Sequence, residues 1–169
     1  MNLSRTFAAL IVAVAVAVGV WLSAMRFSTA EMAPNVTYTL LDSRITDVTA
    51  LRGKVVLVNF WATSCTACVH EMPQIAAMHE KFKSRGYDTV AVAMRYDAPA
   101  SVIQFAESRR LPFGVAIDNT GAVARAFGSV ELTPTTVLIN RRGEIVKRFV
   151  GEPDFAALHA LVERLLAEA

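Results

Sequence analysis

The sequence contains two cysteines, and they stand three residues apart in the segment Cys65-Thr66-Ala67-Cys68. The preceding residues 55–60 form a short apolar run rich in β-branched side chains, which is typical of a strand buried on both faces. A helix is expected to begin at Cys65. Because residues three apart on a helix face the same side, the two sulfurs can close a disulfide. The placement of the pair therefore indicates redox chemistry.

The two sulfurs are expected to differ. Cys65, at the first helical turn, meets free backbone N–H groups and the positive end of the helix dipole, which favour the thiolate. Cys68 lies further inside and would resolve a mixed disulfide formed at Cys65. An inert disulfide is the alternative, but a bridge over four residues removes little chain entropy.

A metal site is the other alternative for the cysteine pair. It would need more ligands, and the sequence offers only His70, His79 and His159. We interpret His70 as an exposed helix residue, and His79 and His159 as residues at a helix surface or boundary. No metal is therefore expected, and no cofactor beyond the Cys65–Cys68 disulfide.

The elements that must position the cysteines alternate between strands and helices. Strands are expected at residues 36–41, 55–60, 89–94, 114–117, 135–140 and 144–150. Helices are expected at residues 65–85, 98–110, 120–127 and 155–166. Strands alternating with helices, followed by a closing hairpin and helix, predict an α/β three-layer sandwich with a central mixed sheet.

Length and composition agree with one folded domain and an appendage. The chain has 169 residues, of which 54% are hydrophobic and 19% charged, and this balance excludes a disordered chain. The formal net charge of +2 also argues against a strongly basic nucleic-acid binder, so no nucleic-acid partner is expected.

The appendage is an uncharged segment at residues 6–25, flanked by Arg5 and Arg26. Twenty helical residues span about 30 Å, the thickness of a bilayer core. Residues 1–30 are expected to be an uncleaved signal anchor or, alternatively, a signal peptide, with residues 31–35 as a linker and 36–169 as the domain. Either interpretation predicts that the domain is exported, and the anchor would hold it at the outer face of the cytoplasmic membrane.

The chain resembles a known family. Its segments Phe60-Trp61-Ala62-Thr63-Ser64-Cys65-Thr66-Ala67-Cys68 and Leu132-Thr133-Pro134-Thr135-Thr136 are similar to those of thioredoxin-like proteins, and above all of the membrane-anchored TlpA/ResA-type thiol-disulfide oxidoreductases. The resemblance runs from about residue 36 to 166 and implies a thioredoxin-like fold. The segment at residues 97–112 stands where this subfamily carries an insertion.

The resemblance implies roles for four further residues. Pro134 matches the cis-proline that packs beside the disulfide, and Thr133 would offer backbone hydrogen bonds to a bound substrate. Trp61 matches the aromatic residue that forms the floor of the site, and the resemblance implies that it binds substrate together with Thr133 and Pro134. Glu71, three residues after Cys68, matches an acid that tunes the cysteines and assists proton transfer; the alternative is a solvated helix residue.

The chain also departs from the family pattern. Asn59 stands where thioredoxin has a buried acid, so that proton-acceptor role cannot be transferred to it. Ala67 replaces the proline that usually precedes the second cysteine, and Ser64 replaces an aromatic residue before the first. Residues around the cysteines change thiolate stability, so redox potential and substrate preference stay open.

The expected function is an exported reductase of protein disulfides that serves cytochrome c maturation or copper-site assembly. Its partners would be a disulfide-bearing substrate, such as apocytochrome c or a copper-site protein, and a membrane electron donor of the DsbD/CcdA type. The alternatives are a copper-delivery protein that uses the cysteines as ligands, and a disulfide oxidase. A peroxidase is disfavoured, because Ala62 stands where that chemistry needs a threonine.

Overall fold

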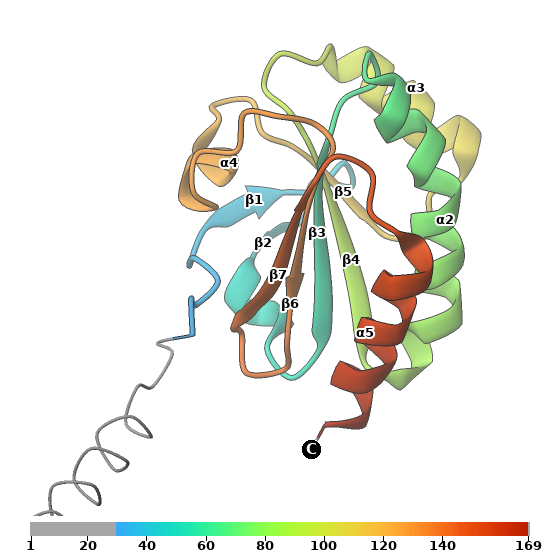
Figure 1. Cartoon of the computed structure of the whole chain (residues 1–169). Coiled ribbons are helices and arrows are strands. Elements are labelled where there is room, and N and C mark those ends of the chain that lie inside the picture. Colours follow the sequence, from blue (N-terminus) through green and yellow to red (C-terminus); the bar gives the residue numbers. More distant parts are fainter. Residues whose placement is uncertain (1–29, 169) are drawn as a thin grey trace, which may run out of the picture. The chain divides into compact units, whose positions relative to one another are not determined.

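The computed structural model describes residues 30–168, which form an α/β domain around a five-stranded sheet (Figure 1). The strands of this sheet are β3 (Val55–Trp61), β4 (Tyr87–Ala93), β5 (Gly114–Ile117), β6 (Thr135–Ile139) and β7 (Ile145–Val150). Their order across the sheet is β5-β4-β3-β6-β7. Strands β3, β4 and β5 are parallel, whereas β6 is antiparallel to β3 and β7 to β6. The predicted central mixed sheet is confirmed.

Further elements cover both faces of the sheet. The helices are α2 (Thr66–Phe82), α3 (Pro99–Arg109), α4 (Ala122–Ala126) and α5 (Phe155–Ala167), and two short 3-10 helices are η1 (Val48–Leu51) and η2 (Lys83–Arg85). Figure 1 shows α2 and α5 on one side of the sheet, and α4 with the small strands β1 (Thr37–Thr39) and β2 (Ile45–Asp47) on the other. This arrangement is the predicted three-layer sandwich.

Strand β3 joins the two halves of the core, because all seven of its residues are buried. Its side chains alternate between the faces, as the geometry of a strand requires. Val56, Val58 and Phe60 pack in the cluster on the α4 side, where the rings of Phe60 and Phe127 are 5.4 Å apart. Leu57 packs against residues of α2 and α5 on the opposite side. The side chain of Asn59 therefore also belongs to the α2 side.

The first predicted strand is only partly correct. Of the residues expected at 36–41, only Thr37–Thr39 are a strand, and they pair with β2 rather than with the large sheet. Strand β2 was not expected from the sequence, because its three residues are too few to show an alternation. A single antiparallel bridge from Leu40 to Ala116 connects this segment to β5.

The long helix ends where the sequence predicts. Helix α2 continues into the single turn η2 and stops at Gly86, whose φ of 87° lies in the left-handed region that glycine adopts without strain. Arg141, in the turn between β6 and β7, is half-buried rather than solvated. Its guanidinium donates to the carbonyl of Leu166 at 3.2 Å and so connects the β6–β7 turn to the end of α5.

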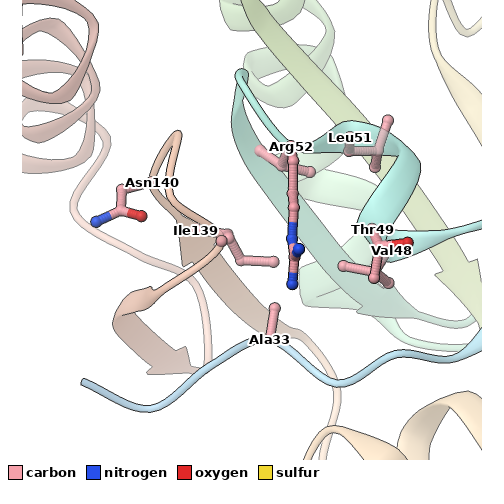
Figure 2. A pocket seen from close by; sticks show the side chains of 9 residues that line it. Ala33, Val48, Thr49, Leu51, Arg52, Ile139 and Asn140 are labelled. Carbon is pink, nitrogen blue, oxygen red and sulfur yellow. The ribbon is translucent and has the colours of Figure 1, made fainter. Parts of the chain in front are cut away.

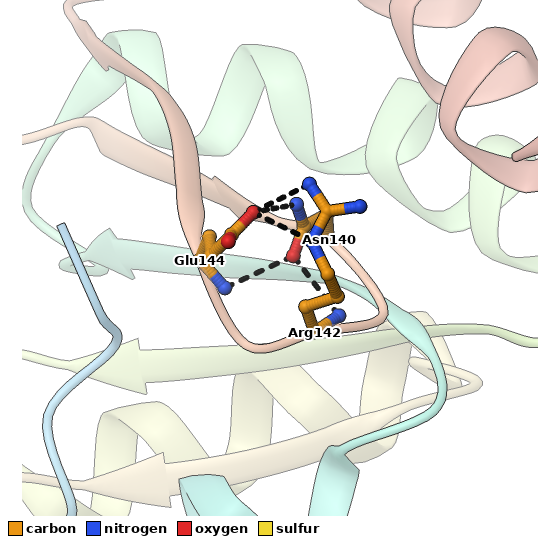
Figure 3. A network of polar contacts seen from close by, with 3 residues as sticks. All are labelled: Asn140, Arg142 and Glu144. Atoms are coloured by element: carbon orange, nitrogen blue, oxygen red, sulfur yellow. Dashed lines mark hydrogen bonds and ion pairs between the residues drawn. The ribbon is translucent and has the colours of Figure 1, made fainter. Parts of the chain in front are cut away.

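The end of the sheet remote from the cysteines holds a small pocket and a hydrogen-bonded turn. Figure 2 shows side chains that line a small pocket beside the end of β6, with Arg52 directed toward Ala33. Figure 3 shows the β6–β7 turn, where Asn140 and Arg142 both donate to Glu144, at 2.7 Å. Both features lie at the start of β3, whereas the cysteines follow its end, so they belong to the scaffold rather than to the redox site.

The predicted signal anchor at residues 1–30 falls almost entirely outside the described residues. Within residues 30–168, no helix has the length and apolar character needed to cross a bilayer. In the segment expected as a linker, the N–H of Ala33 donates to the carbonyl of Gly143 at 2.8 Å, and Glu31 accepts from the N–H of Ile145 at 2.7 Å. These residues are therefore held against the β6–β7 turn.

Candidate active site

The two cysteines form a disulfide at the start of α2. Cys65 is the N-cap residue of this helix, and its Sγ accepts a hydrogen bond from the N–H of Cys68 at 3.2 Å. Cys65 is half-buried, whereas Cys68 has no exposed surface. The sulfur of Cys65 is thus the one that a large substrate can reach. This agrees with the expected division into an attacking and a resolving thiol.

Glu71 is fully buried, so the alternative of a solvated helix residue is wrong. It lies three residues after Cys68 on the same face of α2. Its Oε1 accepts a hydrogen bond from Nδ2 of Asn59, on β3, at 2.7 Å. The same Nδ2 donates to Oγ1 of Thr136, on β6, at 3.0 Å. A helix and two strands therefore hold this carboxyl group in the core beside the disulfide.

Burial raises the pKa of Glu71 from 4.5 to about 7, because an apolar environment disfavours the charged form. The hydrogen bond from Asn59 acts in the opposite direction, and the smaller effects are that Glu152 raises this pKa and His70 lowers it. Glu71 thus exchanges its proton near neutral pH, where a general acid or base is most effective. The structure thus buries a titratable carboxyl group three residues after Cys68, on the same face of α2.

Trp61 lies beneath the site rather than on its surface. Its side chain has no exposed area and belongs to the same core cluster as Cys68 and Met72. Its ring is 5.1 Å from that of Phe105, on α3. The predicted position as floor of the site agrees with this packing, but direct substrate binding by Trp61 does not, because a fully buried side chain offers no surface to a substrate.

The Thr133–Pro134 peptide bond is cis, as the resemblance implied. Thr135 pairs with Phe60 on β3, so the register places this loop at the end of the sheet where the cysteines follow. The carbonyl of Pro134 accepts from the N–H of Gly151 at 2.8 Å, which fixes the loop against the end of β7. The roles of Thr133 and Pro134 in substrate binding stay predictions.

Two residues that the sequence did not single out connect the loops of the site. Both carboxylate oxygens of the buried Asp97 accept from Thr63, one from its N–H and one from its Oγ1, each at 2.6 Å. The hydroxyl of Tyr96 lies 3.2 Å from Oγ1 of Thr133. Since β3 and β4 are parallel, residues that follow them meet at one edge of the sheet. That rule could have indicated Asp97 from the sequence.

The histidines are dispersed over the domain. His70 is exposed, as expected, and its Nδ1 lies 3.0 Å from Oε1 of Glu152. His159 is a half-buried residue within α5, as expected, and its ring lies against that of Phe82. The expectation for His79 is wrong, because its ring is buried between the rings of Tyr87 and Phe113 and this burial lowers its pKa. Among residues 30–168, no three His, Cys, Asp or Glu side chains are arranged to hold a metal ion.

Comparison with known proteins agrees with this site. The family model described as Redoxin matches residues 28–162. The chain belongs to the redoxin family. Among its relatives, the thiol-disulfide oxidoreductase ResA of Bacillus subtilis is 34% identical over 127 residues, which cover 75% of this chain and 70% of that protein. ResA of Halalkalibacterium halodurans is 32% identical over 139 residues, which cover 82% of this chain and 78% of that protein.

Solved structures give the same assignment. The structure of a protein from Neisseria meningitidis described as a thioredoxin has a TM-score of 0.77 and 38% identity, covering 83% of this chain and 93% of that one. A protein from Chlorobium tepidum described as a thiol:disulfide interchange protein DsbE has a TM-score of 0.75 and 28% identity. The match covers 81% of this chain and 96% of that one. The resemblance to the ResA-type proteins is confirmed, and this redoxin is a thiol-disulfide oxidoreductase.

Proposed function

We propose that this oxidoreductase works as a reductase of protein disulfides. The burial of Cys68 beside Glu71 is the observation that carries the proposal. An apolar environment disfavours a thiolate, and so does an ionised carboxylate nearby. A pair whose thiolate form is disfavoured gives up its electrons more readily, because the disulfide is then the more stable state.

In the proposed reaction the thiolate of Cys65 attacks one sulfur of a substrate disulfide and forms a mixed disulfide. The other substrate sulfur leaves with the electron pair and takes up a proton. Cys68 then attacks the sulfur of Cys65. The Cys65–Cys68 disulfide forms, the bond to the substrate breaks, and the second substrate thiol is released. Glu71 is the group proposed to accept the proton of Cys68 in this step.

We further propose that the domain acts outside the cytoplasmic membrane. The apolar segment at residues 6–25 and the relatives named ResA and DsbE support this location. An exported reductase needs renewed electrons, because an oxidising compartment supplies no thiol pool. A membrane electron donor of the DsbD/CcdA type would provide them. Substrates of the apocytochrome c or copper-site class fit such a reductase.

The reduction potential of the Cys65–Cys68 pair tests whether the protein reduces or oxidises its substrate. The full chain is equilibrated in glutathione or dithiothreitol buffers, and the fraction of disulfide is measured by thiol alkylation and mass spectrometry. We expect a potential at least as reducing as that of thioredoxin, about −270 mV. A value near that of the oxidant DsbA, about −120 mV, would contradict the reductase and favour a disulfide oxidase.

A further inference from the structure

Asn59 is the exception in an otherwise apolar strand. Its neighbours in β3, Val58 and Phe60, are buried core residues, and Asn59 itself has no exposed surface. Burying an amide costs free energy unless its polar atoms are hydrogen-bonded. The two hydrogens of Nδ2 are matched by two acceptors, Oε1 of Glu71 and Oγ1 of Thr136, whereas the buried Oδ1 has no partner among residues 30–168. The amide group is therefore positioned by β6 and directed at the carboxyl group.

This hydrogen bond makes the two oxygens of Glu71 unequal. An N–H group donates to Oε1 in either protonation state, so the proton of the neutral carboxyl belongs on Oε2. Oε2 is buried and has no hydrogen-bond partner among residues 30–168. It is thus the oxygen left to exchange a proton. The nearest thiol in sequence on the same helical face is Cys68, which is also fully buried.

Few other charged groups influence this carboxyl. Glu152, in the loop after β7, raises the pKa of Glu71, and His70, on α2, lowers it. These two side chains lie 3.0 Å apart, and that of His70 is 71% exposed, so solvent screens their effect. The side chains that face Glu71 from β3 and β6, Asn59 and Thr136, do not titrate. Asn59 is therefore the group best placed to set the behaviour of this acid.

We propose that Asn59 is a positioning residue for thiol-disulfide exchange, because its Nδ2 holds Oε1 of Glu71 and leaves Oε2 to exchange a proton with Cys68. This inference rests on the proposed function. When Cys68 attacks the mixed disulfide, its proton passes to Oε2 of ionised Glu71 and a bond forms between the sulfurs of Cys68 and Cys65. The bond from Cys65 to the substrate breaks, and the substrate thiolate leaves with the electron pair. The proton on Oε2 is then given up to solvent, which protonates that thiolate.

The experiment follows the two steps separately. The reduced full chain is mixed with dithionitrobenzoate, an aromatic disulfide whose two halves absorb visible light when released as thiolates. The first release reports attack by Cys65, and the second reports resolution by Cys68. The rate of the second release is measured between about pH 5 and pH 9, around the range in which Glu71 loses its proton. The variants are Asn59→Leu, Glu71→Gln and the double variant, with Thr136→Val as the matched control.

Loss of the donor disfavours the carboxylate, so Asn59→Leu should shift the midpoint of this profile upward by about one pH unit. Thr136→Val keeps the bond from Nδ2 to Oε1 and should shift the midpoint much less. Glu71→Gln should remove the midpoint, and the double variant should behave as Glu71→Gln does. If Asn59→Leu does not fold, Asn59→Asp replaces it. Its second carboxyl beside Glu71 should also move the midpoint upward.

Two results overturn the inference. One is a folded Asn59 variant whose midpoint equals that of the wild type. The other is an effect of Asn59→Leu that persists unchanged in the Glu71→Gln background, because it would then not act through Glu71. A wild type that releases neither thiolate would refute the proposed redox function itself. Normal two-step release with no dependence on Asn59 would refute the inference alone.

Discussion

Replacing Glu71 by Gln should stabilise the oxidised protein, and the gain should grow with pH. Gln keeps an oxygen that accepts from Nδ2 of Asn59 but has no proton to lose. The pKa of Glu71 rises from 4.5 to about 7 on folding, so the folded state binds this proton more tightly than the unfolded state. Stability is therefore lost as pH rises above 4.5, and the loss is complete above about pH 7.

The magnitude follows from the two pKa values. Each pH unit between them corresponds to about 1.4 kcal/mol, so ionised Glu71 costs the folded state about 3 kcal/mol above neutral pH. Near pH 4, where both states carry the proton, Glu71→Gln should leave the free energy of unfolding close to that of the wild type. Near pH 8 the variant should be more stable by about 3 kcal/mol.

The assay is denaturant unfolding of the oxidised full chain, followed by circular dichroism at several pH values between these limits. Glu80→Gln is the matched control, because Glu80 is an exposed residue of the same helix that pairs with Lys83. It should change the free energy of unfolding little at any pH. A difference between Glu71→Gln and the wild type that stays constant with pH would refute the raised pKa, and with it the acid–base role of this residue.

Three further predictions concern the scaffold of the site. Asp97→Asn should slow the attack by Cys65 and leave the oxidised fold in place, because the substitution weakens the two hydrogen bonds from Thr63. The rate of the first release of thionitrobenzoate measures this attack. An unchanged rate would show that these hydrogen bonds do not position Cys65. Leu138→Ala should lower the free energy of unfolding by about 2–5 kcal/mol, because Leu138, on β6, is fully buried against α5. Denaturant unfolding measures this loss, and a loss below about 1 kcal/mol would contradict that packing. Burial lowers the pKa of His79, so the unfolded state binds more protons than the folded state as pH falls below 6.5, and the free energy of unfolding declines. His79→Phe should reduce this decline in denaturant unfolding. An equal decline in both proteins would count against a buried neutral ring.

The positions of the cysteines were predictable from the sequence because local patterns specify them. The run at residues 55–60 and the helix after it fix where Cys65 and Cys68 lie, and Gly86 marks the end of that helix. The cis bond before Pro134 followed from the resemblance rather than from any local pattern. These features need only short-range signals or a family motif.

The contacts that tune the site were not predictable in this way. Asn59 meets Glu71 and Thr136 only because the register of three elements brings them together. Asp97 reaches Thr63 from 34 residues further along the chain. The burial of His79 depends on Tyr87 and Phe113, whose positions follow from the packing of α2 against the sheet edge. Helical periodicity alone could not distinguish Glu71 as a solvated residue from Glu71 as a buried acid.

The central claim is that Cys65 attacks a substrate disulfide and Cys68 resolves the intermediate. It is tested most directly by comparing the full-chain variants Cys68→Ser and Cys65→Ser. Each variant is reduced and then mixed with native insulin, whose disulfides are intact and accessible. Mass spectrometry of the non-reduced products identifies the linked residues. Cys68→Ser should accumulate a mixed disulfide through Cys65, and Cys65→Ser should accumulate little, because Cys68 is buried. Equal capture by the two variants, or capture by Cys65→Ser alone, would contradict the assignment of the two sulfurs.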